Sequence, residues 1–229
     1  MDKDLKLIKK KYLSIIQELK KNNKLYYEKS DPKISDLEYD KLKKEILDLE
    51  SEYKFLKSKD SPSSSVGLKP SKIFFKHKHR IKMLSLSNAF NKEDLVNFEK
   101  KISNFLNLKE NNNIEYSVEP KIDGISASLT YKNSNLVLGL SRGDGIEGEI
   151  ITENLKTIRD IPKKINHKSF PKDIDIRGEV YIGKKDFEKI QDRFANPRNA
   201  ASGSLRQKNP NETKKIPLRF IAYTYGFID

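Results

Sequence analysis

The spacing of apolar residues changes once along this chain, and that change restricts the fold more than any other feature of the sequence. Up to residue 106, apolar side chains recur every three or four positions, as on helices with one buried face. After Asn111 they alternate with polar side chains, as on strands that bury one side. The pattern therefore predicts an α+β fold, with helices first and a largely antiparallel sheet after them.

Three helices are predicted before the change of period. The first begins near Leu5 and continues to Tyr27, after which Asp31-Pro32 breaks the pattern. The second follows at once, so residues 1–57 are expected to form a helical hairpin. The third is predicted from about Asn91 to Leu106, with an inward apolar face. The apolar stripes of the second and third helices are Leu42, Ile46, Leu49 and Tyr53, and Leu95, Phe98, Ile102 and Phe105.

Turn signals divide the alternating region into strands. Asp123-Gly124 and Asn133-Ser134 are dipeptides that favour turns. A short helix, Lys184–Phe194, is predicted between the last two strands. The predicted strands are Ile114–Glu119, Ile125–Tyr131, Asn135–Ser141, Ile174–Ile182 and Leu218–Tyr225.

The run KDSPSSSVGLKPSK at residues 59–72 has the composition of a linker. It separates a helical domain at 1–58 from a larger domain at 73–229. The helical pair is too small to bury much apolar surface alone.

Charge composition favours an anionic partner. The chain has 46 Lys and Arg against 33 Asp and Glu, a formal net charge of +13. Nucleic acid or a phosphate-rich ligand would suit that excess, although a general preference for lysine in this sequence would also produce it. The chain contains no cysteine, which excludes disulfides and thiolate zinc sites within it. No secretory signal or membrane helix is evident, so a cytoplasmic location is expected.

The stretch Glu119-Pro120-Lys121-Ile122-Asp123-Gly124 places a lysine between two carboxylates. On an extended segment Glu119, Lys121 and Asp123 project from one face. Taken alone, this arrangement is more typical of a surface ion pair than of a nucleophile, because nearby negative charge favours the charged amine.

Three further motifs follow in a characteristic order. They read SRGDGIEGE at 141–149, IRGEV at 176–180 and FANPRNAASGSLRQ at 194–207. Together with the lysine motif they strongly resemble the adenylation domain of bacterial NAD-dependent DNA ligases, and the resemblance covers essentially the whole chain. It implies a nucleotidyltransferase (ATP-grasp-like) fold preceded by the helical domain, with the nucleotidyltransferase domain incomplete at its C-terminus.

The resemblance assigns the chemistry to Lys121. In the family this lysine attacks the α-phosphate of NAD, forms a phosphoramidate with AMP and expels nicotinamide mononucleotide. The amine must lose its proton to do so, through desolvation or nearby positive charge. Asp123 would assist through polar contacts around the lysine, and it also suits a turn before Gly124.

The resemblance also implies a nucleotide-binding set. Glu119 would recognise the adenine amino group and Glu179 the ribose, because carboxylates accept hydrogen bonds from amino and hydroxyl donors. Tyr223 would stack on adenine. The remaining nucleotide contacts implied are Arg142, Ser85 and Leu86.

Arginine is rare in this lysine-rich chain, so its positions are informative. Seven of the eight arginines follow residue 140, and a rigid guanidinium suits phosphate contacts better than an ammonium. The resemblance implies that Arg198 and Arg206 act on nicked DNA and in later reaction steps. Scatter in a small count is the other explanation.

The helical hairpin is the argument for a dinucleotide rather than ATP. Asp36, Tyr39 and Asp40 lie on one face of the second helix, and Tyr26 and Tyr27 end the first. Without the resemblance this face would be read as helix packing. With it, tyrosine faces suit the positively charged nicotinamide ring, and carboxylates can accept from its amide and ribose.

The expected function is that of an NAD-dependent DNA ligase, which joins nicked double-stranded DNA using NAD and Mg²⁺ or Mn²⁺. No resident metal ligand is expected among these residues, and Zn²⁺ is expected only in a longer parent protein. We expect a monomer that contacts no membrane, and we expect the 229 residues alone not to seal nicks. A nucleotidyltransferase using ATP or GTP, or a non-catalytic nucleic-acid-binding protein, remains as an alternative.

Overall fold

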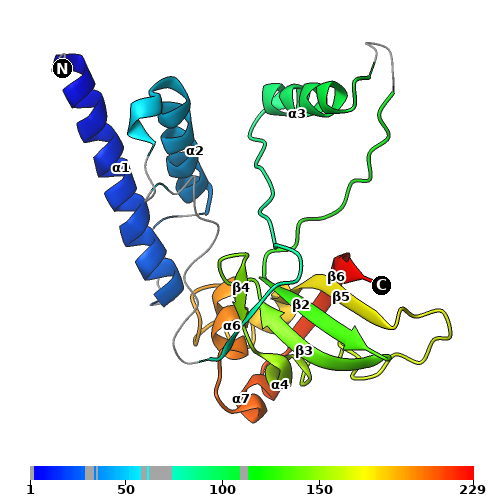
Figure 1. The fold of residues 1–229 in the computed structure, drawn as a ribbon. Helices are drawn as coiled ribbons and strands as arrows, with labels where there is room; N and C mark the ends of the chain where they lie inside the picture. The colour runs from blue at the N-terminus through cyan, green and yellow to red at the C-terminus, as the bar shows by residue number, and fades with distance from the viewer. Residues whose placement is uncertain (1–2, 29–33, 35, 58–60, 62–73, 109–112) are drawn as a thin grey trace. The chain divides into compact units, whose positions relative to one another are not determined.

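The computed structural model describes residues 3–28, 34, 36–57, 61, 74–108 and 113–229 (Figure 1). It divides into two compact units: residues 1–83 together with 122–229, and residues 84–121. In the described residues no helix is both long and apolar enough to cross a membrane.

The predicted helical hairpin is confirmed. Helix α1 spans Lys3–Glu28 and helix α2 spans Asp36–Glu52, followed by a short 3-10 helix, η1, at Lys54–Leu56. A small apolar core lies between them, and the buried Tyr12 hydroxyl donates to Glu50 at 2.6 Å. The buried apolar side chains of this core are Tyr12, Ile15, Ile16, Leu19, Ile46 and Leu56.

The interpretation of residues 59–72 as a linker falls almost entirely outside the described residues. Ser61 is described there, and it is buried, with its hydroxyl donating to Glu50.

The predicted antiparallel sheet is also confirmed. It has four strands in the order β3-β2-β5-β6. The tight turn between β2 and β3 places Asn133 and Ser134 at positive φ, as the Asn-Ser turn signal suggests. The last strand runs three residues beyond its predicted end. The strands are β2 (Ile125–Lys132), β3 (Asn135–Ser141), β5 (Asp173–Ile182) and β6 (Leu218–Ile228).

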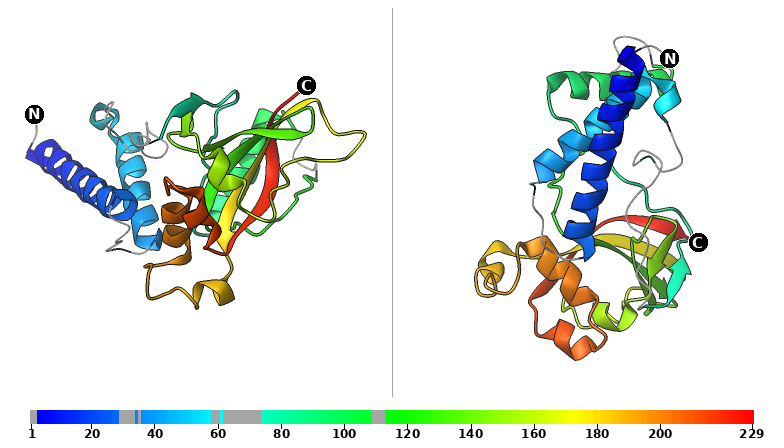
Figure 2. Two further views of the ribbon diagram at one scale, coloured as in Figure 1. Left: turned by 90° about the horizontal axis from the view of Figure 1, so that it is seen from below. Right: turned by 90° about the vertical axis from the view of Figure 1, so that its left-hand side faces the viewer.

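One face of this sheet carries the main core. Alternate residues of β2 and β5, such as Leu129 and Val180, are fully buried there. Figure 2 shows α6 and α7 on one side of the sheet, and Leu205 of α6 and Leu155 of α4 join the core. These helices are α4 (Thr152–Leu155), α6 (Pro197–Leu205) and α7 (Pro210–Lys214).

Helix α6 explains much of the FANPRNAASGSLRQ run. The Asn196 side chain caps the helix by accepting from the Asn199 amide at 2.7 Å, and Pro197 occupies the first turn. Ala200 and Ala201 are completely buried, and their small side chains allow the helix to lie close to the sheet.

A second, two-stranded sheet joins β1 (Lys76–Lys78) to β4 (Glu147–Glu149). The SRGDGIEGE run connects the two sheets: its first residue, Ser141, ends β3, and its last three residues form β4. Gly143 has φ of +57°, and a Cβ there would lie 1.9 Å from the Glu147 carbonyl oxygen, so this turn needs glycine.

Two predictions are wrong within the unit of residues 84–121. Helix α3 (Lys92–Phe105) forms as expected and is capped by Asn91, but it has no buried residue, and Phe105 is 85% exposed. The expected strand Ile114–Glu119 does not form. One helix and two extended segments offer the apolar stripe little surface to pack on; the Phe98 ring lies 6.4 Å from the Tyr116 ring, centroid to centroid. The described residues of this unit contain no strand with which residues 114–119 could pair.

The helix predicted at Lys184–Phe194 is shorter than expected. Helix α5 spans Lys184–Phe187, and turns continue from there to Arg193.

The hairpin core predicts a difference between two neighbouring residues of α2. Ile46 is completely buried, whereas Leu47 is 43% exposed. Ile46→Ala should lower the free energy of unfolding by about 2–4 kcal/mol because it removes core contacts and leaves a cavity. Leu47→Ala should cost less than about 1 kcal/mol. Denaturant unfolding followed by far-UV circular dichroism measures both, and equal effects would contradict the hairpin packing.

Candidate active site

The face of the sheet opposite the main core is polar, and we call it the polar face. It is formed by alternate side chains of β2 and β5, because successive residues of a strand point to opposite sides. Its members are Ser126, Ser128 and Thr130 of β2, and Asp173, Asp175, Arg177 and Glu179 of β5.

Ser126, Glu179 and Tyr223 form a cluster on the polar face. Ser126 and Glu179 are paired across β2 and β5, and the Ser126 hydroxyl donates to Glu179 at 2.8 Å. Glu179 is 9% exposed. Burial raises the pKa of Tyr223, as does the nearby Glu179 carboxylate, while a hydrogen bond to Ser126 acts in the opposite direction. The structure thus brings together Glu179 and Tyr223, and it adds Ser126, which sequence analysis missed.

Arg142 lies at the end of β3, in the turn that carries the SRGDGIEGE run. Its amide donates to the Ser126 carbonyl at 3.2 Å, which brings it to the same end of β2. Its own carbonyl is 3.1 Å from Nε2 of His79. Because a carbonyl only accepts, Nε2 must carry the hydrogen. His79 was not anticipated from the sequence.

Asp123 is held at the start of β2. Gly124 is buried, and a Cβ there would lie 2.2 Å from the Val180 carbonyl oxygen, so the motif needs glycine at this position. The Asp123 carboxylate pairs with Arg198 of α6 at 2.8 Å. Two residues expected to act at different reaction steps therefore contact each other.

Arg206 has a structural partner. Its Nε donates to Glu149 at 3.0 Å, and Glu149 is 1% exposed. The Glu149 amide in turn donates to the Ser141 Oγ at 3.0 Å. The guanidinium that the resemblance assigns to DNA thus also balances a buried carboxylate.

Four expected residues belong to the unit of residues 84–121. Glu119 and Lys121 are exposed near its end, in a segment without strand pairing. Ser85 and Leu86 lie near its beginning and are also exposed, Leu86 strongly so.

Comparison with known proteins decides what these motifs belong to. The family model for the NAD-dependent DNA ligase adenylation domain matches residues 71–229, and the model for the DNA ligase-like, N-terminal NAD+-binding domain matches residues 6–67. The chain belongs to the NAD-dependent DNA ligase family.

Curated relatives of this ligase-family chain carry the name DNA ligase. The protein from Pelagibacter ubique strain HTCC1062 is 65% identical over 226 residues, covering 99% of this chain and 33% of the relative. Those from Parvibaculum lavamentivorans and Clostridioides difficile strain 630 are 49% and 45% identical, covering 91% and 97% of this chain and 31% and 33% of the relatives. The chain spans about a third of the length of the relatives it matches.

In this ligase-family chain the hairpin residues are partly described. The Tyr39 hydroxyl donates to Asn23 at 2.8 Å, and its ring packs against the hairpin core. Asp40 is half-buried. Tyr26 and Tyr27 lie near the end of α1 and Asp36 begins α2, but their side chains lie outside the described part of the structure.

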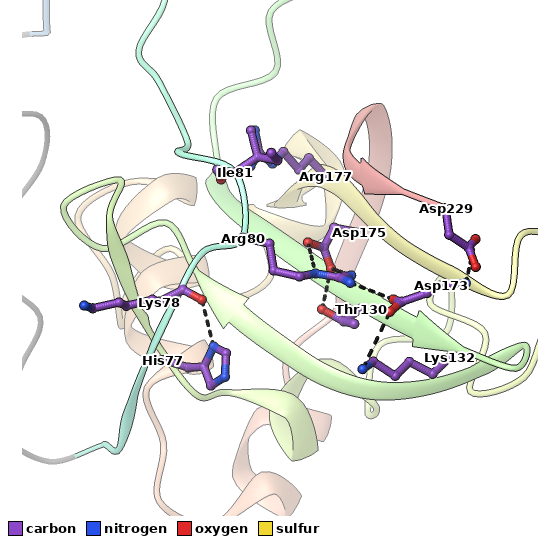
Figure 3. Close-up of polar contacts among 10 residues, drawn as sticks. All are labelled: His77, Lys78, Arg80, Ile81, Thr130, Lys132, Asp173, Asp175, Arg177 and Asp229. Carbon is purple, nitrogen blue, oxygen red and sulfur yellow. Dashed lines mark hydrogen bonds and ion pairs between the residues drawn. The ribbon is translucent and has the colours of Figure 1, made fainter.

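A charged network on the polar face was missed from the sequence. Arg80 binds both Asp173 and Asp175, and Asp175 also accepts from Thr130 at 2.6 Å (Figure 3). The alternation of Ser and Thr in β2 and of Asp, Arg and Glu in β5 is a visible signal for a polar face. Arg80, which binds Asp173 and Asp175, precedes them by more than ninety residues in the chain. No local pattern in the sequence indicates that contact.

The environment of His79 predicts a pH dependence. Burial lowers the pKa of His79, and the Arg177 charge adds to this, while the Arg142 carbonyl and Asp175 oppose it. The unfolded chain therefore takes up this proton near the ordinary value of about 6.5, before the folded chain does. Above about pH 6.5 His79 is neutral in both states, and its contribution to stability is complete. Below that pH the contribution is progressively lost, because the unfolded chain takes up the proton more readily than the folded chain.

We expect wild-type protein to lose more stability than His79→Gln between about pH 7.5 and 5.5. Glutamine can still donate to the Arg142 carbonyl but does not titrate. Urea unfolding of both proteins at the two pH values measures this. Parallel losses would show that His79 does not carry the dependence.

The Arg206–Glu149 pair predicts a stability effect separate from any DNA contact. Arg206→Ala should lower the free energy of unfolding by about 3 kcal/mol, because a buried carboxylate loses its balancing charge. Adding Glu149→Gln should recover part of that loss, since the neutral amide is less costly to bury. Thermal or chemical denaturation without DNA tests the pair, and additive losses would contradict it.

Proposed function

We propose that this chain carries the step in which AMP is transferred from NAD to Lys121. The Lys121 nitrogen, after losing its proton to solvent, forms a bond to the α-phosphorus of NAD. The bond from that phosphorus to the oxygen bridging the two phosphates breaks, and nicotinamide mononucleotide leaves with the electron pair. The observation that carries the proposal is local: the Lys121-Ile122-Asp123-Gly124 motif leads directly into β2, where Ser126 bonds Glu179 on the polar face.

The Ser126–Glu179–Tyr223 cluster supports binding of the adenosine half. A carboxylate accepts hydrogen bonds from ribose hydroxyls, and Ser126 fixes the orientation of Glu179. Tyr223 is 47% exposed beside them, so a flat base can lie against its ring. Glu119 is proposed for the adenine amino group and Arg142 for a nucleotide contact. Ser85 and Leu86 complete the proposed set.

The exposure of Lys121 sets a condition on the chemistry. An ammonium in water is not a nucleophile, so binding of the nucleotide must remove water from the amine before it can react. We propose that Asp123, oriented by Arg198, then helps to place the amine.

The helical domain is proposed to bind the nicotinamide mononucleotide half. Tyr26, Tyr27 and Tyr39 would face the positively charged ring, and Asp36 and Asp40 would accept from its amide and ribose. The packing of Tyr39 on the hairpin core shows that this residue has a structural role as well.

Magnesium is proposed to act with the phosphates of the dinucleotide, whose charge it would neutralise. Among the described residues, no three His, Asp or Glu side chains gather as a metal-binding group, so we assign it no protein ligand. Nicked double-stranded DNA is proposed as the later substrate, contacted by Arg198 and Arg206. A cytoplasmic location and a monomeric state are part of the same proposal.

Mass spectrometry tests the proposal directly. The full chain, incubated with NAD and Mg²⁺, should gain one adenylyl group at Lys121, and Lys121→Ala should abolish it. Lys101→Ala is the matched control, because Lys101 is also exposed and lies in the same unit. It should be adenylylated as wild type is.

Parallel incubation with ATP identifies the donor. An adduct formed from ATP but not from NAD would contradict the choice of dinucleotide. An adduct on another lysine would contradict the assignment of Lys121. Absence of any adduct would show that these residues do not perform the step.

A further inference from the structure

Arg177 lies at the centre of the polar face, and its side chain reaches across to the main chain before the Met83-Leu84-Ser85-Leu86 run (Figure 3). One terminal nitrogen donates to the Lys82 carbonyl at 3.2 Å, and the other donates to the Ile81 carbonyl. Two successive carbonyls are thus held by one planar guanidinium. A lysine could not reproduce this fork, because its ammonium is a single point of donation.

Arg177 binds these carbonyls although carboxylates flank it on β5. Asp173 and Asp175 are both bound by Arg80, and Glu179 accepts from Ser126. The chain at residues 80–82 is therefore attached to β5 at three successive positions. Arg80 attaches through its side chain, and Ile81 and Lys82 attach through their carbonyls.

The other side of the same segment is held by the turn that carries Arg142. The His79 amide donates to the Ile146 carbonyl and the Met83 amide to the Gly145 carbonyl, each at 2.9 Å. The Met83 side chain is buried. Residues 79–83 are thus held from two sides, and Ser85 follows two residues later.

Gly226 provides the space that the Arg177 guanidinium occupies. A Cβ at position 226 would lie 2.8 Å from Nε of Arg177 and 3.0 Å from its Cζ. Because a guanidinium is the end of a flexible side chain, Gly226→Ala would displace Arg177 rather than the strand. The structure therefore offers a way to move this group without removing its charge.

We propose that Arg177 is a positioning residue for cofactor binding: by holding the Ile81 and Lys82 carbonyls, it fixes the main chain at residues 79–83, the segment that continues in the sequence to Ser85 and Leu86. The inference rests on the proposed function, because it takes those two residues as dinucleotide contacts. Arg177 itself has no contact with the dinucleotide in this proposal.

Hydrogen exchange on the free full chain tests the structural part without any nucleotide. Arg177→Lys and Gly226→Ala should each speed exchange of the Met83 amide by about tenfold, the size expected for losing one hydrogen bond to a charged group. Amides of β2 and β3 should exchange as in wild type. Arg219→Lys is the control, because Arg219 pairs with Asp160 at the other end of β6, and it should leave Met83 unchanged.

NAD titration of AMP transfer tests the functional part. Both variants should raise the NAD concentration for half-maximal transfer by about tenfold, with a much smaller change in the maximal rate. If the Met83 amide of both variants exchanged at the same rate as in the wild-type chain, the proposal would be overturned. A higher NAD concentration for half-maximal transfer, together with an unchanged exchange rate of the Met83 amide, would also overturn it, because Arg177 would then contact the dinucleotide itself.

Failure of the proposed function is recognised separately. If wild-type chain takes no AMP from NAD, the assigned reaction is wrong, whereas the exchange data still decide whether Arg177 holds residues 79–83. Should Arg177→Lys fold poorly, Gly226→Ala gives the same comparison with the arginine retained.

Discussion

The antiparallel pairing of β2 with β5 is the interaction on which the adenylation-domain residues depend. It gives the sheet two different faces, because paired residues point to the same side and successive residues to opposite sides. On one face Leu129 and Val180 are buried with the helices. On the other, Ser126 meets Glu179 and Thr130 meets Asp175. A register shift of one residue would exchange the two faces, so core packing also holds the candidate site in place.

Arginine use in this chain follows from the same arrangement. Lysines supply most of the positive charge, while the arginines at 80, 198, 206 and 219 bind carboxylates and Arg177 binds carbonyls. Arg80 and Arg177 each donate through more than one guanidinium nitrogen, which is the rigid fork that the sequence argument expects of a rare arginine. The forks described here hold the protein together, and any phosphate contact by Arg198 or Arg206 is an additional, proposed role.

Much of the fold could be predicted from the sequence, because most elements carry a local signal. The hairpin stripe containing Ile46 and the alternation in β2 and β5 are examples. The expected strand Ile114–Glu119 does not form, because a strand must pair with another strand. The alternation of apolar and polar residues does not indicate whether such a partner is present. The helix after Gly183 stopped at Phe187, since helical spacing alone did not indicate its end. The motifs identified some residues of the candidate site, such as Asp123 and Glu179. They did not include Ser126, His79 or Arg80.

The sequence by itself determined most of the element types, the family and the residues that carry the family's motifs, because these depend on local periodicity and on short, specific runs. Only the tertiary structure decided which groups meet: Arg198 with Asp123, Arg206 with the buried Glu149, and Arg177 with the main chain before Met83. The physical reason is that these partners are separated by tens of residues in the chain. They come within hydrogen-bonding distance only after the sheet has paired and α6 has packed against it.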